Sequence, residues 1–165
     1  MAALADEVPA RTDATVPGAS LRHLVGYAAL QVQLQLRDVF LARIGVPFEL
    51  RPVEFALLGL LADRAPMTQK QLAVALRLKA PNLTVIVERL LARGLLARRR
   101  NARDGRSLLV SLTATGRRLQ ARAHAESLTM EDQALAGLSP SERAQLLDLL
   151  WRVGAPGDPI DDQVA

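Results

Sequence analysis

The chain has 165 residues, of which 50% are hydrophobic and only 3% aromatic, a formal net charge of +4, and no cysteine. This length suits one domain with or without an added oligomerisation element, and the Leu-, Ala- and Arg-rich composition favours a mainly α-helical fold. Without cysteine, disulfides, thiolate metal sites and cysteine redox sensing are excluded. Two histidines and no carboxylates at ligand spacing lead us to expect no metal and no cofactor.

The N-terminal part has two regions. Residues 1–19 lack hydrophobic periodicity, so we expect a flexible arm. Ser20 is a candidate N-cap for a helix from Leu21 to about Ile44, which would be about 36 Å long at ~1.5 Å per residue. Its apolar residues occupy more than one face, and we prefer a dimer interface to a buried core helix as the explanation. We therefore assign residues 20–50 to a dimerisation helix and its connector.

The middle part begins with helices. We expect Gly45 to end the first helix, with a connector up to Arg51. A second helix should start at Pro52 and run to about Arg64. Thr68 and Gln71 then have the spacing of a capping box, which predicts the start of a short helix ending near Leu76.

The next stretch combines a helix with a hairpin. After a turn over residues 77–80, Pro81 fits the first turn of a helix that Gly94 closes. Residues 95–100 and 106–112 are short enough to be two paired strands around a tip. Residues 51–113 therefore have the element order of a winged helix-turn-helix with a two-stranded β-wing.

The C-terminal part is again helical. Thr113 should cap a long helix reaching about Ala136, and Ser139 with Glu142 forms a second capping-box pattern, which predicts the last helix. We assign residues 114–153 to C-terminal dimerisation helices and residues 154–165 to a flexible tail.

Positive charge is concentrated in one stretch. Residues 77–106 contain nine basic side chains and two acidic ones, so the rest of the chain is net acidic. Such a block is typical of a nucleic-acid-binding face, although solvated basic surfaces also occur in proteins that bind no nucleic acid.

The element order suggests how double-stranded DNA would be contacted. The second helix of a helix-turn-helix enters the major groove, where Asn82 can pair with adenine and Thr84 and Val85 can contact a thymine methyl. An ordinary surface role for Asn82 is the alternative. Arginines farther along the helix and on the strand would meet phosphates; they are Arg89, Arg93, Arg98, Arg99 and Arg100.

Several residues give a more specific resemblance. Leu72-Ala73, Gly94-Leu95 with Arg98, Asp104-Gly105-Arg106, and Leu112-Thr113 with Gly116 resemble the signature of MarR-family transcriptional regulators. The resemblance extends from about Leu21 to Val153. It implies a homodimer that binds a pseudo-palindromic operator, with Arg103 and Arg106 on the wing tip, Arg106 in the minor groove, and Asp104 anchoring the tip. Arg77 departs from the family's frequent glycine, and Lys79 from its Ser or Thr cap.

The same resemblance implies a repressor released by a small aromatic or phenolic ligand. The local candidates for binding that effector are His23 and Tyr27 on the first helix and Phe48 and Arg51 in the connector, since an arginine beside aromatic rings suits an aromatic carboxylate. An exposed His23 and an interfacial Tyr27 are the alternatives.

Other classes of function remain open to different degrees. An architectural DNA-binding protein without a ligand, or an activator, would have the same DNA-binding elements. An enzyme is not expected, because there is no cysteine, no glycine-rich phosphate loop and no carboxylate–histidine spacing, and hence no catalytic residue to name. The N-terminus lacks a signal-peptide pattern and no apolar run approaches about 18 residues, so we expect a cytoplasmic protein with no membrane partner.

Overall fold

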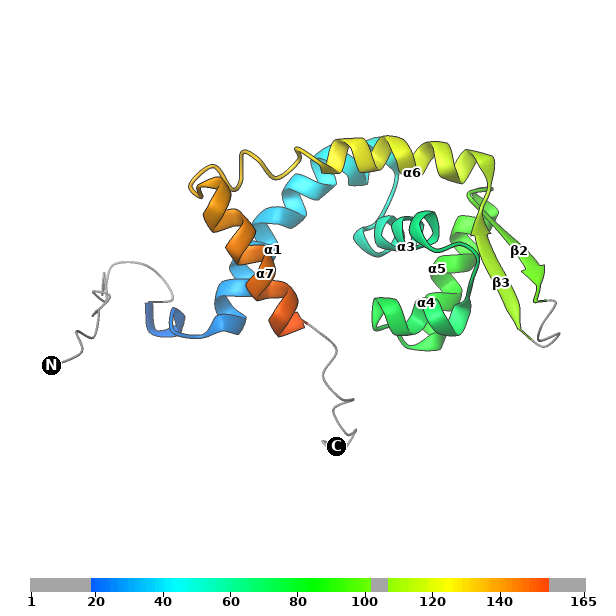
Figure 1. The fold of residues 1–165 in the computed structure, drawn as a ribbon, viewed down its shortest axis with the longest axis horizontal. Coiled ribbons are helices and arrows are strands. Elements are labelled where there is room, and N and C mark those ends of the chain that lie inside the picture. Colours follow the sequence, from blue (N-terminus) through cyan, green and yellow to red (C-terminus); the bar gives the residue numbers. More distant parts are fainter. Residues whose placement is uncertain (1–18, 102–106, 155–165) are drawn as a thin grey trace, which may run out of the picture.

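The computed structural model describes residues 19–101 and 107–154. It is mainly helical with a small antiparallel sheet, as the composition predicts. Figure 1 shows an elongated molecule, with α1 (Val25–Phe40) and α7 (Pro140–Gly154) at one end and the sheet at the other. Helix α6 (Ala114–Ser127) runs along the top between these two ends. None of the helices within the described ranges is both long and apolar enough to cross a bilayer.

The N-terminal helical run differs from the prediction at both ends. After a short 3-10 turn, η1 (Ala19–Leu21), α1 begins at Val25 with Leu24 rather than Ser20 at the N-cap. Gly45 does not end the run, because its backbone is right-handed helical and the chain continues through a π-helical turn, η2 (Leu41–Gly45), into α2 (Val46–Phe48). The run ends at Glu49, whose φ of 54° lies in the left-handed region. Much of the expected connector is therefore helix.

The helix-turn-helix is confirmed. Helix α3 (Pro52–Asp63) is followed by α4 (Gln69–Leu76) and α5 (Ala80–Ala92). The predicted capping box starts α4. The backbone N–H of Gln71 donates to Thr68 Oγ1 at 3.2 Å, and the backbone N–H of Thr68 donates to Gln71 Oε1 at 2.8 Å. Pro81 lies in the first turn of α5, and Arg77 provides the left-handed residue of the intervening turn with a φ of 51°.

The sheet has one strand more than predicted. Strands β2 (Leu96–Arg100) and β3 (Leu108–Leu112) form the expected hairpin stem, with Leu96 opposite Leu112. The third strand is β1 (Met67–Thr68), which pairs with β3 on its other edge. A two-residue strand lacks the alternation by which strands are found in a sequence, so only its pairing reveals it.

The first of the two C-terminal helices is shorter than predicted, so the two helices are farther apart in the chain. Thr113 caps α6 as expected, because its Oγ1 accepts from the Gly116 amide at 3.0 Å. The helix ends at Ser127 rather than near Ala136, and turns lead from there to α7. The second capping box is confirmed, since the Ser139 amide donates to Glu142 at 2.8 Å.

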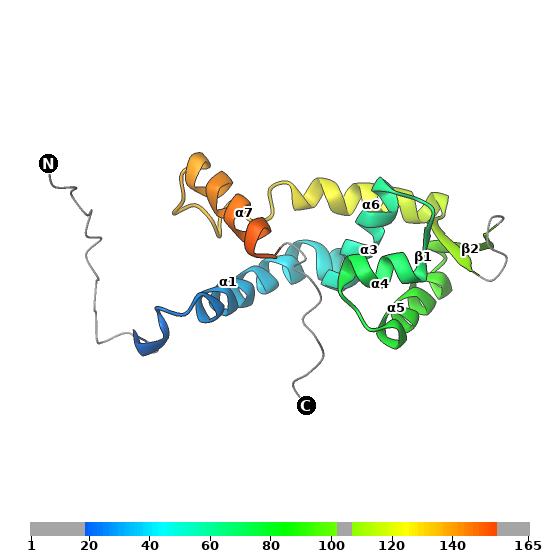
Figure 2. The ribbon, with the colours of Figure 1, turned by 60° about the horizontal axis from the view of Figure 1, so that its bottom comes forward.

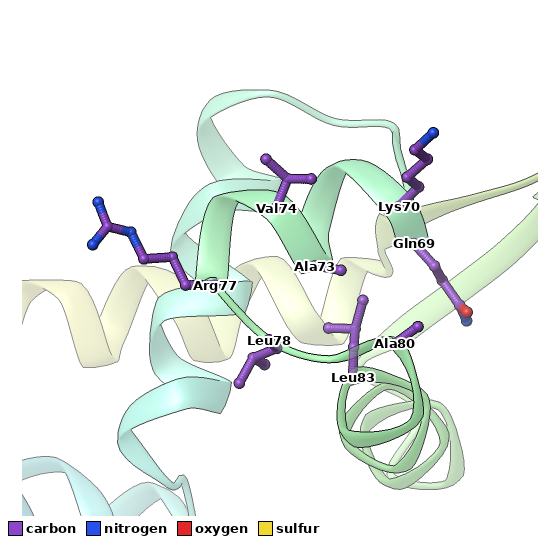
Figure 3. A pocket seen from close by; sticks show the side chains of 8 residues that line it. All are labelled: Gln69, Lys70, Ala73, Val74, Arg77, Leu78, Ala80 and Leu83. Atoms are coloured by element: carbon purple, nitrogen blue, oxygen red, sulfur yellow. The ribbon is translucent and has the colours of Figure 1, made fainter. Parts of the chain in front are cut away.

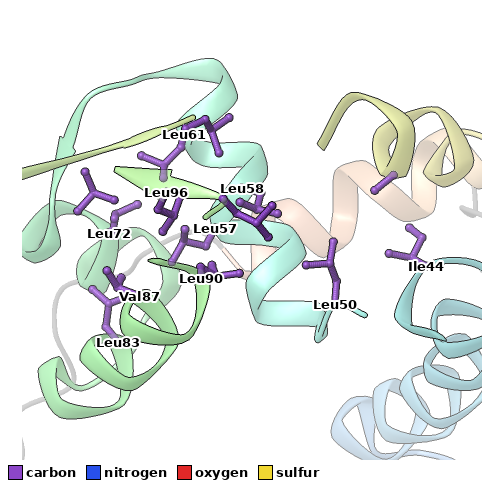
Figure 4. Close-up of a cluster of buried hydrophobic side chains, with 14 of the residues drawn as sticks. Ile44, Leu50, Leu57, Leu58, Leu61, Leu72, Leu83, Val87, Leu90 and Leu96 are labelled. Atoms are coloured by element: carbon purple, nitrogen blue, oxygen red, sulfur yellow. The ribbon is translucent and has the colours of Figure 1, made fainter. Parts of the chain in front are cut away.

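The hydrophobic core lies among α3, α4, α5 and the sheet. Leu57, Leu61, Leu72, Val87 and Leu90 are buried there, and Figure 4 shows them converging beside Leu96. Burying such side chains contributes about 1.5–3 kcal/mol each. The same cluster extends to Phe40 and Ile44 of the N-terminal run and to Ala123 of α6. By contrast, α7 is fully described and none of its residues is buried.

Candidate nucleic-acid interface

Helix α5 presents one polar face to solvent. Leu83, Val87 and Leu90 anchor its opposite side in the core. This leaves Asn82, Thr84 and Val85 exposed in its first two turns, as the sequence predicts, and Val85 is 68% exposed despite being apolar. The Thr84 hydroxyl bonds to the Ala80 carbonyl at 3.0 Å. An exposed helix start with one amide and one apolar side chain is suited to reading base edges.

A hollow of about 410 Å³ lies between α4 and α5. Figure 3 shows Gln69 and Ala80 close together at one end of it, with Lys70 directed outward beside them. The first helix of a helix-turn-helix crosses the DNA backbone, so Gln69 and Lys70 are additional candidates for phosphate contacts. Neither residue is among the DNA contacts predicted from the sequence, although their place in the first turn of α4 is a usable signal.

The strand arginines do not all have the same environment. Arg98 is half-buried and forms an ion pair with Glu88 of α5 at 2.7 Å, which fixes the hairpin to that helix. Arg99 and Arg100 are exposed. At the base of the tip, the backbone N–H of Asn101 donates to the Ser107 carbonyl at 3.0 Å. The three predicted tip residues, Arg103, Asp104 and Arg106, lie outside the described residues.

The two arginines late in α5 are held by protein groups. Arg89 forms an ion pair with the buried carboxylate of Glu54 at 3.2 Å. Arg93 donates to the backbone carbonyls of Glu49 and Phe48 at 2.7 and 3.1 Å. The sequence assigns both arginines to DNA phosphates, but in this structure their partners lie at the end of α2 and in the first turn of α3.

The four candidate effector residues are not brought together within one chain. His23 precedes α1 and is exposed, and Tyr27 is half-buried in its first turn. Phe48 lies at the far end of the same helical run, where the Arg122 guanidinium stacks over its ring at 5.5 Å. Arg51 is exposed beyond it. Two of the four residues therefore lie at each end of the run.

A largely apolar groove of about 640 Å³ runs between α1 and α7, which lie next to each other in Figures 1 and 2. Val32, Leu36 and Phe40 line it from α1, and Leu146 and Leu150 from α7. None of the four candidate effector residues lines this groove. Many further apolar side chains on the two helices are exposed; they include Leu24, Val25, Leu30, Leu34, Leu147, Leu149, Trp151 and Val153.

Groups that could hold a metal ion are missing from the described part of the chain, where no three His, Asp or Glu side chains cluster. The chemistry of the interface is instead that of hydrogen-bond donors, one apolar contact and positive charge. Groups of this kind are suited to binding a polyanion and to reading base edges.

Comparisons with known proteins agree with this geometry. A family model described as the MarR family matches residues 48–107, which span the end of α2, the helix-turn-helix and the start of the hairpin. An HTH-type transcriptional regulator of Bacillus subtilis, YkoM, is 34% identical over 103 residues, covering 62% of this chain and 67% of that protein.

Two solved structures are also similar over most of their length. The transcriptional repressor CouR, bound to a 23-mer DNA duplex, superposes with a TM-score of 0.78 at 32% identity, covering 84% of this chain and 98% of that one. Bordetella bronchiseptica BpsR, whose DNA binding is regulated by 6-hydroxynicotinic acid, superposes with a TM-score of 0.71 at 26% identity, covering 79% and 98%.

Proposed function

The chain belongs to the MarR family of DNA-binding transcriptional regulators, and we propose that it is a homodimeric repressor released from its operator by a small aromatic effector. The observation that carries the proposal is the pairing of two surfaces at opposite ends of one chain: the exposed start of α5 and the uncovered apolar faces of α1 and α7. Repression is supported by the similarity to CouR, which is a transcriptional repressor.

We assign the DNA contacts from the exposed residues. Asn82 would pair with adenine, and Thr84 and Val85 would contact a thymine methyl in the major groove. Arg99 and Arg100, on the exposed strand, would meet phosphates together with Lys70. The tip residues Arg103, Asp104 and Arg106 are assigned through the family resemblance alone, with Arg106 in the minor groove.

Uncovered apolar surface supports the proposed homodimer. The side chains of Trp151 and Val153 are 76% and 79% exposed, and α1 carries a comparable apolar face. A monomer that kept these faces in water would forgo about 25 cal/mol per Å² of burial. A second copy of the same two helices would cover them and place two α5 helices against two half-sites of one operator.

The effector is proposed to be a small aromatic acid. The regulation of BpsR by 6-hydroxynicotinic acid supports this class of ligand. Phe40 and Pro52, at the end of α1 and the start of α3, both line the groove between α1 and α7, and Arg37 lines it as well. An aromatic ring against Phe40 and a carboxylate against Arg37 would suit that chemistry. The four effector residues predicted from the sequence would belong to this site only if the dimer brought the two ends of the N-terminal helical run together. They are His23, Tyr27, Phe48 and Arg51.

One sequence of experiments tests repression and the effector. Selection of bound fragments from genomic DNA should return pseudo-palindromic sites that lie over promoters. A panel of aromatic acids should then include compounds that raise the melting temperature of the protein and release it from a selected site, because a ligand of the folded state stabilises it by mass action. Tight operator binding with no thermal or release response to the panel would favour a ligand-independent architectural protein, and reporter induction on DNA binding would favour an activator.

The dimer has its own test. Leu150→Glu places a charge in the apolar groove between α1 and α7 and should produce monomers in sedimentation measurements. Arg152→Glu is the matched control, since it changes the charge of an exposed side chain two residues along the same helix. A dimer of Leu150→Glu as tight as the wild type would contradict the assigned interface.

A further inference from the structure

Polar contacts of Arg89, in the last turn of α5, and of Arg93, the residue after this helix, attach it to the end of α2 and the first turn of α3. Arg89 Nη1 lies 3.2 Å from Glu54 Oε1, in an ion pair rather than a directed hydrogen bond. One turn later, Arg93 donates from Nη1 to the Glu49 carbonyl at 2.7 Å and from Nη2 to the Phe48 carbonyl at 3.1 Å. We call Glu54, Arg89 and Arg93, with these two carbonyls, the arginine clamp.

The carboxylate in the clamp depends on both of its partners. Glu54 is only 1% exposed, and its Oε2 accepts from the Arg51 amide at 2.8 Å at the start of α3. A buried carboxylate is costly unless it is paired, so loss of Arg89 would leave an uncompensated charge. The two carboxylate oxygens therefore make different contacts, since Oε2 caps the start of α3 and Oε1 holds α5.

The carbonyls in the clamp are those that a helix end leaves without partners. The helical run ends at Glu49, and its last carbonyls have no amide ahead of them in the helix. The planar fork of Arg93 supplies two donors in a fixed geometry and satisfies both. The Arg93 side chain is 23% exposed, so most of it is committed to this contact and not to solvent.

The clamp acts on the end of the helical run that forms the proposed dimer interface. Its two carbonyls, of Phe48 and Glu49, lie at the end of the run formed by α1, η2 and α2, whereas Glu54 lies in the first turn of α3. The π-helical turn η2 is itself tied to α6, because Arg43 forms an ion pair with Glu126 at 2.9 Å. Arg93 therefore joins α5 directly to the end of the N-terminal helical run, and Arg89 joins it to the first turn of α3.

We propose that Arg89 and Arg93 are positioning residues, which set the placement of α5 relative to the N-terminal helices and hence the spacing of the two half-sites that a dimer reads. The proposal rests on the dimeric DNA-binding function proposed above. This role differs from a phosphate contact, because the guanidinium groups of Arg89 and Arg93 bind a carboxylate and two backbone carbonyls of the protein itself.

Two substitutions separate these roles. Glu54→Gln has a single acceptor oxygen, which cannot serve both the Arg51 amide and Arg89, so the clamp should open and operator affinity should fall roughly tenfold. If Arg89 instead contacts a phosphate, removing its competing carboxylate would leave affinity unchanged or raise it. Arg93→Lys keeps the charge but loses the two-donor fork, and should also weaken binding roughly tenfold.

The matched control is Arg99→Ala, at an exposed strand position. Arg99→Ala should lose operator affinity as expected for the loss of one phosphate contact. Its affinity should depend less steeply on salt, and its preference for half-site spacing should be unchanged. The clamp variants should show the opposite pattern. On operators with one base pair inserted between the half-sites, wild type and Arg99→Ala should bind poorly, whereas Glu54→Gln and Arg93→Lys should lose most of that discrimination.

The outcomes are distinguishable. A clamp variant that keeps wild-type spacing preference and loses only salt dependence would overturn the positioning role. Wild-type protein with no preference for spacing at all would instead contradict the proposed dimeric reading of DNA. Cooperative thermal unfolding of each variant is checked first, and if Glu54→Gln does not fold, the Arg93→Lys comparison decides the question alone.

Discussion

Gly116 lies in the first turn of α6, where a side chain would collide with the hairpin. A Cβ built at this position would lie 2.0 Å from the Leu95 carbonyl oxygen and 3.0 Å from its carbon. These are backbone atoms that cannot rotate away as a flexible side chain could. The Leu95 oxygen is also held in place, because the Thr113 amide donates to it at 3.0 Å. Gly116→Ala must therefore displace α6 from β2.

The cost of this change follows from what the displacement breaks. Overpacking against a fixed backbone costs about 1–3 kcal/mol, and loss of the Thr113 cap on the Gly116 amide costs about 1 kcal/mol more. We therefore expect Gly116→Ala to lower the free energy of unfolding by roughly 2–4 kcal/mol, and the melting temperature by roughly 5–15 °C. Operator binding should weaken as well, since α6 joins the hairpin to the helices of the proposed dimer.

The assay is urea and thermal unfolding at a fixed protein concentration, with gel-shift titration of operator DNA beside it. Gly59→Ala is the control: nothing lies within 4 Å of its Cβ, and alanine favours the interior of α3. It should leave stability unchanged or raise it slightly. If Gly116→Ala were as stable as Gly59→Ala, the close approach of α6 to Leu95 would not be a constraint on the fold, and the reasoning would fail.

Three further predictions concern charge. Operator affinity should fall steeply with salt if Arg99, Arg100 and Lys70 meet phosphates as proposed, and a flat dependence in a binding titration would refute the assigned face. Arg106→Ala should weaken operator binding by about 1–3 kcal/mol without changing sedimentation of the dimer, and unchanged binding would refute its role. The Ser139 hydroxyl and backbone amide donate to the Glu142 carboxylate and so lower the pKa of Glu142. The stabilisation of the start of α7 by these bonds is present above the ordinary glutamate pKa, and it should be lost as the pH falls through the lowered pKa of Glu142. Circular dichroism should show this acid transition weakened in Glu142→Gln.

Local signals predicted the helix starts well. Thr68, Thr113 and Ser139 each cap the helix expected of them, since a cap is made between residues close in sequence. Helix ends were predicted less well. Gly45 can adopt a right-handed helical conformation like any residue, and packing of Ile44 in the core keeps the chain helical past it. The end of α6 at Ser127 was likewise not predicted, because no glycine or proline follows directly to indicate a helix end.

The outward residues of α5 could be predicted because a buried stripe at helical spacing leaves the opposite face exposed. Arg89 and Arg93 could not be assigned in this way. A charged side chain on the flank of a helix has the same sequence signal whether it faces DNA, solvent or a buried carboxylate. Glu54 shows the same limit, since its place in the first turn of a helix predicts a cap but not an ion pair with a helix thirty-odd residues later.

The amino-acid sequence by itself determined the kind of molecule: helices with their caps, a basic helix-turn-helix and hairpin, and a family signature that includes Gly116. These properties depend on neighbouring residues and on composition, which are present in the unfolded chain. Only the tertiary structure decided which basic side chains remain available to DNA and which are committed to the protein. Glu54 meets Arg89, and the Phe48 carbonyl meets Arg93, only when α5 packs beside α2 and α3. No local pattern encodes a contact between segments so far apart in the chain.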